Sequence, residues 1–189
     1  SIGIGSMIDV SVLFFVPVMW LAMFFHLQSM TLRTFISSLF GLICPYWFVA
    51  VYLIYTNDIT LAVEHFSQLA VFGKVANFSQ VPVSALVSIC YITILSVVGI
   101  IHYLRNRVFD KTRTRMFYNT FILFDIFTIA FIILQPQHYA TMLIILIVTT
   151  SPLIAHFIAL THTWITNLAF KVIVATALSL TIINILQLI

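Results

Sequence analysis

Apolar residues gather in six long runs that short polar connections separate. The runs lie at 7–27, 35–55, 82–104, 116–134, 139–159 and 168–188. Each approaches or exceeds the roughly 20 residues with which a helix crosses about 30 Å of hydrocarbon. Helices satisfy their own backbone hydrogen bonds in lipid, and the alternating ten-residue pattern of membrane β-barrels is absent from the sequence. The pattern therefore predicts an all-α integral membrane protein, a bundle of about six transmembrane helices that forms a single domain over 1–189.

Composition agrees with this class. Hydrophobic residues make up 62% of the 189 positions and charged residues 7%, whereas soluble domains hold about 45–50% and 25%. Cys44 and Cys90 lie inside apolar runs and are expected to be packing residues rather than a disulfide. The expected partners are membrane lipids and other membrane subunits, and the few basic residues argue against nucleic acid.

Basic residues set the expected orientation. Five of the eight Lys and Arg side chains lie in the connection 105–115: Arg105, Arg107, Lys111, Arg113 and Arg115. Loops rich in Lys and Arg stay on the cytoplasmic side, so the sequence predicts a bacterial inner-membrane protein with loop 105–115 cytoplasmic and loop 56–81 periplasmic. The same five residues are candidates for binding lipid headgroups, and the alternative is that they only determine topology.

The 56–81 connection has an apolar side at helical spacing, and we predict an amphipathic interfacial helix there. This side consists of Ile59, Ala62, Val63, Phe66, Leu69 and Ala70. Two interpretations are open: a lid over a cavity, or a helix whose apolar side rests in lipid.

Three prolines, Pro17, Pro45 and Pro152, fall inside predicted spans. An interior proline kinks a helix and frees a backbone carbonyl, which transporters use to build sites at mid-membrane depth. Kinks that serve packing alone are the alternative, because membrane helices tolerate proline well.

Asp125 is the most informative single residue, because it lies near the centre of the fourth run. A carboxylate there costs about 2.5–3.5 kcal/mol on insertion scales, so it should face protein or water. Tyr118 and Thr128 share its helix face. With the three prolines, these residues are the candidates for substrate binding or ion coupling. The alternative is a neutral, hydrogen-bonded carboxyl group with a structural role.

Motifs for other chemistry are missing from the sequence. The six histidines show no His-x-x-x-His or His-Glu-x-x-His spacing, and no nucleophile elbow or phosphate-binding glycine loop occurs. We therefore expect no cofactor and no bound metal, and no catalytic residue can be assigned.

Four segments together carry a resemblance: Leu13-Phe-Phe-Val-Pro17, Leu32-Arg33-Thr-Phe35, Gly41-Leu-Ile-Cys-Pro45-Tyr46 and Ser151-Pro152-Leu-Ile-Ala-His156. The chain resembles a domain-of-unknown-function family of multi-pass inner-membrane proteins typical of the Bacteroidetes. The resemblance implies that the chain corresponds to the C-terminal part of a longer protein, in agreement with its first residue, Ser1. It implies the membrane topology but no activity.

The function that these observations favour is transport or binding of a small or lipid-like substrate within the bundle. The interior prolines, the central Asp125 and the possible lid support it. A membrane enzyme that acts on lipid-linked intermediates and a non-catalytic subunit of a membrane complex are the two alternatives.

Overall fold

The structure, a computed structural model, describes residues 2–56, 59–67, 69, 76–78, 81–160 and 164–188. In this part of the chain all regular structure is helical. The elements are α1 (Ile2–Ile8), η1 (Val10–Phe14), α2 (Phe15–Phe25), α3 (Leu32–Thr56), α4 (Ile59–Ser67), α5 (Val83–Asn106), η4 (Arg107–Phe109), α6 (Thr112–Leu134), η5 (Pro136–His138), α7 (Tyr139–Leu160) and α8 (Trp164–Leu188). Five segments in the described part are long and apolar enough to cross a membrane, which confirms the all-helical, multi-pass class. They are Leu32–Thr56, Val83–Asn106, Thr112–Leu134, Pro136–Leu160 and Asn167–Ile185.

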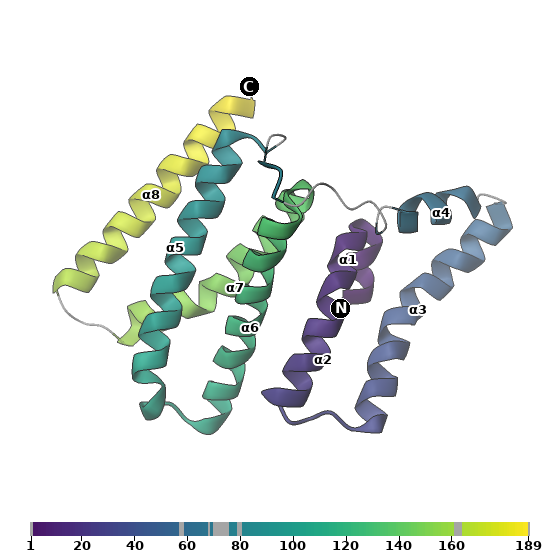
Figure 1. The fold of residues 1–189 in the computed structure, drawn as a ribbon, viewed down its shortest axis with the longest axis horizontal. Coiled ribbons are helices and arrows are strands. Elements are labelled where there is room, and N and C mark those ends of the chain that lie inside the picture. Colours follow the sequence, from purple (N-terminus) through teal and green to yellow (C-terminus); the bar gives the residue numbers. More distant parts are fainter. Residues whose placement is uncertain are drawn as a thin grey trace.

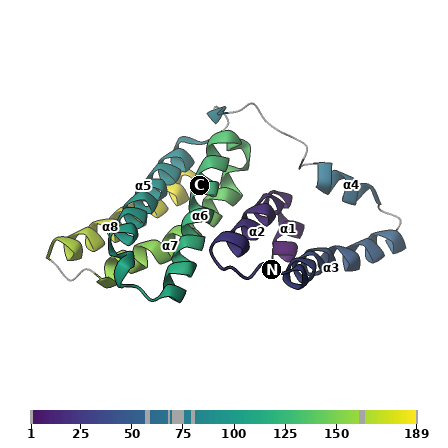
Figure 2. The same cartoon turned by 60° about the horizontal axis from the view of Figure 1, so that its bottom comes forward.

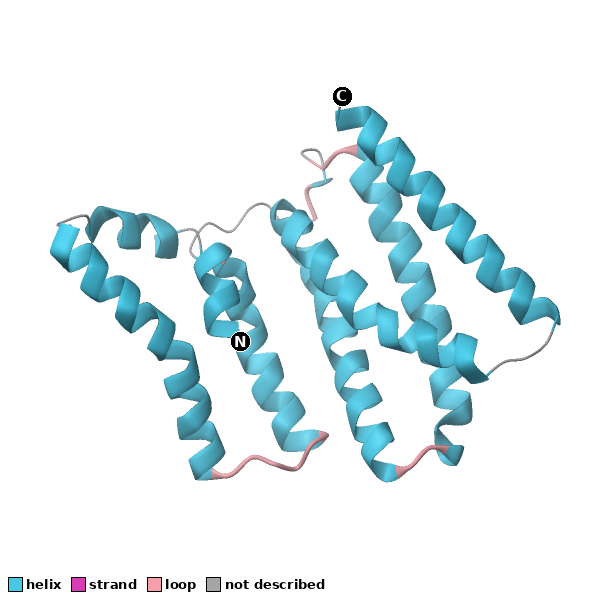
Figure 3. Ribbon diagram, turned by 180° about the vertical axis from the view of Figure 1, so that it is seen from behind, coloured by secondary structure: helices cyan, strands magenta, loops and turns pink. Residues whose placement is uncertain are grey.

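The long helices form two groups that stand side by side (Figures 1 and 3). One group holds α1 to α4 and the other α5 to α8. The connection between α5 and α6 and the turn between α2 and α3 lie at the same end of the molecule, here called the basic-loop end. Helix α4 and the turn between α6 and α7 lie at the opposite end, the α4 end, as Figure 2 also shows.

The second group has its core where α7 packs against both α5 and α6. Gly99 of α5 lies close against α7: a Cβ atom there would lie 2.9 Å from the Cβ atom of Leu153 on α7. The absence of a side chain at Gly99 therefore sets how closely α5 and α7 approach, as small residues do between membrane helices.

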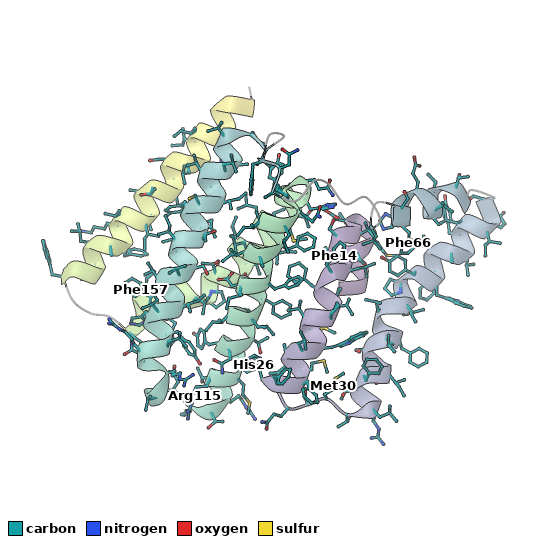
Figure 4. The ribbon with its side chains drawn as sticks, viewed as in Figure 1. Phe14, His26, Met30, Phe66, Arg115 and Phe157 are labelled. Carbon is teal, nitrogen blue, oxygen red and sulfur yellow. The ribbon has the colours of Figure 1, made fainter. Side chains whose placement is uncertain are left out.

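Aromatic rings join the two groups. Phe14 of η1 lies between α2 and α6 (Figure 4), and its ring centroid is 5.0 Å from that of Phe131 in α6. Phe15 contacts Phe124 and Phe127 of α6 at centroid distances of 6.0 and 5.2 Å. These contacts extend a buried cluster that includes Phe15, Phe131, Ile132, Met142 and Leu146.

The first predicted span differs from the structure. The single helix expected over 7–27 is divided into α1, η1 and α2, and the chain reverses direction near Asp9 (Figures 1 and 3). Asp9 caps η1 because its carboxylate accepts a hydrogen bond of 2.8 Å from the backbone N–H of Ser11. The apolar segment that remains, Val10–Phe25, is shorter than the other five, so a sixth crossing remains a prediction.

The three interior prolines separate into two cases. Pro17 lies in the first turn of α2. Backbone N–H groups in a first turn have no partner within the helix, so proline costs no helix hydrogen bond there. Pro45 and Pro152 lie inside α3 and α7. The expected kinks at these two positions remain a prediction.

Helices α3 and α8 carry the clearest membrane character. None of the residues in their spanning segments is buried. In water two such helices would expose apolar patches far larger than a soluble monomer tolerates, whereas lipid solvates them. Helix α8 is fixed to α5 by two hydrogen bonds, from the Tyr91 hydroxyl to the Ile173 carbonyl (2.8 Å) and from Asn184 to Ser88 (3.2 Å).

Candidate functional site

An apolar pocket of about 310 Å³ lies between α1, α3 and α4 at the α4 end of the molecule. Phe66 of α4 lies near the end of that helix that is closer to α1, between α1 and α3 (Figure 4). The lining comes from all three helices and consists of Met7, Tyr46, Val49, Ala50, Leu53, Leu61, Ala62, His65 and Phe66. This composition suits an apolar ligand, since Tyr46 and His65 are the residues in the lining that offer polar groups.

Two polar contacts meet at Ser6 of α1, one from α4 and one from α3. The Nε2 atom of His65 lies 2.9 Å from the backbone oxygen of Ser6. A carbonyl oxygen only accepts, so Nε2 must carry the proton in this contact. The Tyr46 hydroxyl donates to the buried Ser6 hydroxyl at 2.7 Å, and the centroid of the Tyr46 ring lies 5.3 Å from that of Phe66, with the rings tilted by 38°. Helices α1, α3 and α4 are therefore joined around one serine.

The helix predicted in the 56–81 connection is present as α4. Its pocket side includes Ala62 and Phe66, as the apolar periodicity predicts, together with His65. Val63 points elsewhere and is 66% exposed. Gln68 and Ala70 lie outside the described residues. A helix that borders a cavity is what the lid interpretation requires.

A separate, polar site surrounds Asp125, which is fully buried where α5, α6 and α7 meet. The Thr149 hydroxyl donates to one carboxylate oxygen at 2.6 Å, and Ser96 donates to the other. Thr150 lies 3.1 and 3.3 Å from the two oxygens. Asp125 therefore faces protein, as the sequence predicts, and hydroxyl groups from α5 and α7 surround it.

The residues expected beside Asp125 are distributed differently. Thr128 is buried, but its hydroxyl bonds to the carbonyl of Phe124 in its own helix at 2.7 Å. Tyr118 lies nearer the basic-loop end, with its ring 4.7 Å from that of His156. Pro152 lies two residues after Thr150, whereas Pro45 packs near Gly3 of α1, whose added Cβ would lie 3.2 Å from the proline ring.

A third cluster closes the basic-loop end. Asp110 in the loop pairs with His156 of α7 at 3.1 Å, and the Tyr103 hydroxyl donates to Asn119 at 3.2 Å. Four of the five candidate headgroup ligands are exposed here: Arg105, Arg107, Lys111 and Arg113. The fifth, Arg115, is half-buried, and its backbone carbonyl accepts from Tyr103 at 3.3 Å.

At the α4 end, Asp9 joins η1 to α7. It accepts hydrogen bonds from Ser11 and from the Thr141 hydroxyl, and Ser11 in turn contacts His138 at 2.9 Å. Asp9 precedes the apolar segment Val10–Phe25. Burial by itself raises the pKa of this carboxyl, but the hydrogen bonds and the nearby His138 hold the pKa below its usual value.

The sequence alone did not identify the partners of these sites. Thr149 and Thr150 form the one Thr-Thr pair within a predicted span, and Ser96 is a single hydroxyl in an apolar run. Both are signals for a polar contact between helices. Nothing in the sequence indicates that His65 would bond to Ser6, which lies 59 positions away.

No family model, no curated protein and no solved structure matches the chain. In the part of the chain that the structure describes, no group of three or more His, Cys, Asp or Glu side chains could hold a metal ion. His162, one of the histidines considered from the sequence, lies outside that part. The assignment of function therefore depends on the geometry of the apolar pocket and of the polar clusters described above.

Proposed function

We propose that the protein binds a lipid-like molecule with a single apolar chain in the pocket between α1, α3 and α4. The observation that carries the proposal is the pocket itself: about 310 Å³ of apolar space, lined by three helices. Its volume lies at the lower end of the range of small-molecule sites. One acyl or isoprenoid chain suits it better than a large ring system.

The polar contact between α4 and α1 supports a gated pocket. The bond between His65 and the Ser6 carbonyl is one hydrogen bond, with a net worth of about 0.5–1.5 kcal/mol. A contact of that strength holds α4 in place yet breaks often enough for a ligand to exchange. Transport of the same molecule would need this binding step first.

We propose the bacterial inner membrane as the location, with loop 105–115 cytoplasmic and the α4 end periplasmic. The concentration of basic side chains in the loop supports this orientation. In that orientation the pocket opens in the outer leaflet, where the chain of a lipid could enter sideways while its headgroup stays in water.

Native mass spectrometry of protein released from a mild detergent tests the proposal. The wild type should carry one bound lipid-like molecule per chain. Ala50→Phe places a phenyl ring in the pocket and should lower the occupancy at least ten-fold. Ala175→Phe is the matched control, because Ala175 is exposed on α8; it should leave the occupancy unchanged.

Equal occupancy in the Ala50→Phe and Ala175→Phe proteins would contradict the proposal, since any bound lipid would then lie elsewhere on the surface. A wild-type protein without bound lipid, which also takes up none from added fatty acid or isoprenol, would contradict it as well.

A further inference from the structure

The carboxylate of Asp125 is buried without a cationic partner. Within the described residues the one ion pair joins His156 to Asp110, and every hydrogen-bond partner of Asp125 is a neutral hydroxyl. Hydroxyl donors stabilise a buried negative charge but do not neutralise it. A lone charge in a low-dielectric interior is strongly unfavourable, so a single positive charge at this point would be bound firmly.

The oxygens around Asp125 come from three helices and converge on one point. Asp125 belongs to α6, Ser96 to α5, and Thr149 and Thr150 to α7. Side-chain oxygens of this kind suit alkali and alkaline-earth ions, whereas transition metals prefer imidazole or thiolate ligands. With one carboxylate and three neutral hydroxyls, a monovalent ion leaves the site neutral and a divalent ion does not.

The hydroxyl of Thr149 can serve a cation without losing its own hydrogen bond. Its oxygen lies 3.1 Å from the Ile145 carbonyl and 3.2 Å from the Leu146 carbonyl of the preceding turn. Its proton can therefore turn to α7 while its lone pairs face the cation. The arrangement in the structure, in which the hydroxyl protons point to the Asp125 oxygens, is then the cation-free state.

Helix α7 also contains a proline next to this cluster. Pro152 has no N–H, so the carbonyl of Val148, four residues earlier, lacks its usual helix donor. Backbone carbonyls without a helix donor are a recurrent ligand for Na⁺ in membrane proteins. The proline expected from the sequence to mark a site thus lies beside the hydroxyls that the structure adds.

We propose that Asp125, Ser96, Thr149 and Thr150 form a Na⁺ site in the centre of the α5–α6–α7 bundle. The site is separate from the pocket under α4 and does not depend on a lipid being bound there. The ion completes the packing of three helices, and its binding should stabilise the folded state by mass action.

Thermal unfolding of the purified protein in lipid nanodiscs tests the site. At constant ionic strength and pH, replacement of choline chloride by NaCl should raise the unfolding midpoint of the wild type, and KCl should raise it less. Binding of radioactive ²²Na⁺ should saturate at one ion per chain. Ser96→Ala should weaken that binding at least ten-fold, and Asp125→Asn should abolish it.

Ser179→Ala provides the matched control, because the Ser179 hydroxyl bonds only within α8 and its side chain is exposed; this variant should bind as the wild type does. If Asp125→Asn does not fold, the Ser96→Ala protein still tests the Na⁺ site. Equal midpoints in sodium and choline, or unchanged ²²Na⁺ binding in Ser96→Ala, would overturn the proposal. Ala50→Phe should retain Na⁺ binding, which separates this test from that of the lipid pocket.

Discussion

At the scale of single residues, hydroxyl groups make a buried carboxylate tolerable. Asp125 accepts from Thr149 and Ser96, and Thr150 lies within hydrogen-bond distance of both its oxygens. The Thr128 hydroxyl, in contrast, bonds only to a carbonyl of its own helix. The side chains that turn toward Asp125 thus tie α5 and α7 to α6 through one residue.

Removal of one hydroxyl tests this arrangement. Thr149→Val keeps the shape of the side chain but leaves Asp125 one donor short, so the free energy of unfolding should fall by about 1–3 kcal/mol. Thr181→Val is the control, because Thr181 is exposed and bonds only to Ala177 in its own helix; it should change stability by less than about 0.5 kcal/mol. Unfolding in mixed detergent micelles measures both, and equal effects would contradict the arrangement.

The sequence predicts that Asp125 is buried against protein, but it cannot supply the partners. The cost of a charge in lipid follows from the position of Asp125 within its own span. Ser96 and Thr149 lie 29 and 24 positions away, and which faces of three helices meet is decided by packing. Tyr118 was expected beside Asp125 because the two residues share a helix face. Seven residues along a helix span about 10 Å, so residues on one face can belong to different sites.

At the scale of elements, two short helices depart from the simple pattern of spans. Helix α1 turns back at Asp9, although hydropathy alone makes 7–27 continuous, because the capping carboxylate stabilises a turn. Helix α4 follows the predicted periodicity at Ala62 and Phe66, but the pattern assigned no role to His65. A polar residue on the apolar side becomes intelligible only when the carbonyl of Ser6 is found opposite it.

The glycines of α5 and α3 give a matched test of helix packing. Gly99→Ala places a methyl group 2.9 Å from the Leu153 Cβ atom and 3.2 Å from its backbone carbon, so α5 and α7 must separate. Unfolding should become easier by about 1–3 kcal/mol. Gly41→Ala meets nothing within 4 Å and should be neutral or stabilising by up to about 1 kcal/mol, because Ala favours helix. Equal destabilisation by the two changes would show that Gly99 does not set the contact.

At the scale of the whole molecule, the two ends differ in character. The basic-loop end presents the exposed basic side chains of Arg33, Arg105, Arg107, Lys111 and Arg113, while the α4 end holds the apolar pocket and the Asp9 contacts. This asymmetry is what a fixed orientation in the membrane requires. The sequence alone predicts this asymmetry of charge, because the basic residues of each loop can be counted without knowledge of the fold.

Cysteine labelling on intact cells tests the orientation. After Cys44 and Cys90 are replaced by Ala, single cysteines at Val108 and at Gln137 provide one exposed site at each end. An impermeant thiol reagent should label the cysteine at 137 and not the one at 108. Labelling at 108 alone would invert the topology and would move the pocket to the inner leaflet.

The most direct test of a lipid pocket under α4 is photo-crosslinking with a fatty acid that carries a diazirine in its chain. Adducts should concentrate on Met7, Ala62 and Phe66, and an excess of unlabelled fatty acid should remove them because the site saturates. Adducts on Leu178 of α8, which bulk lipid contacts, should persist under the same competition. Adducts in the pocket that resist competition as those on α8 do, or no adducts in the pocket at all, would contradict the binding function proposed here.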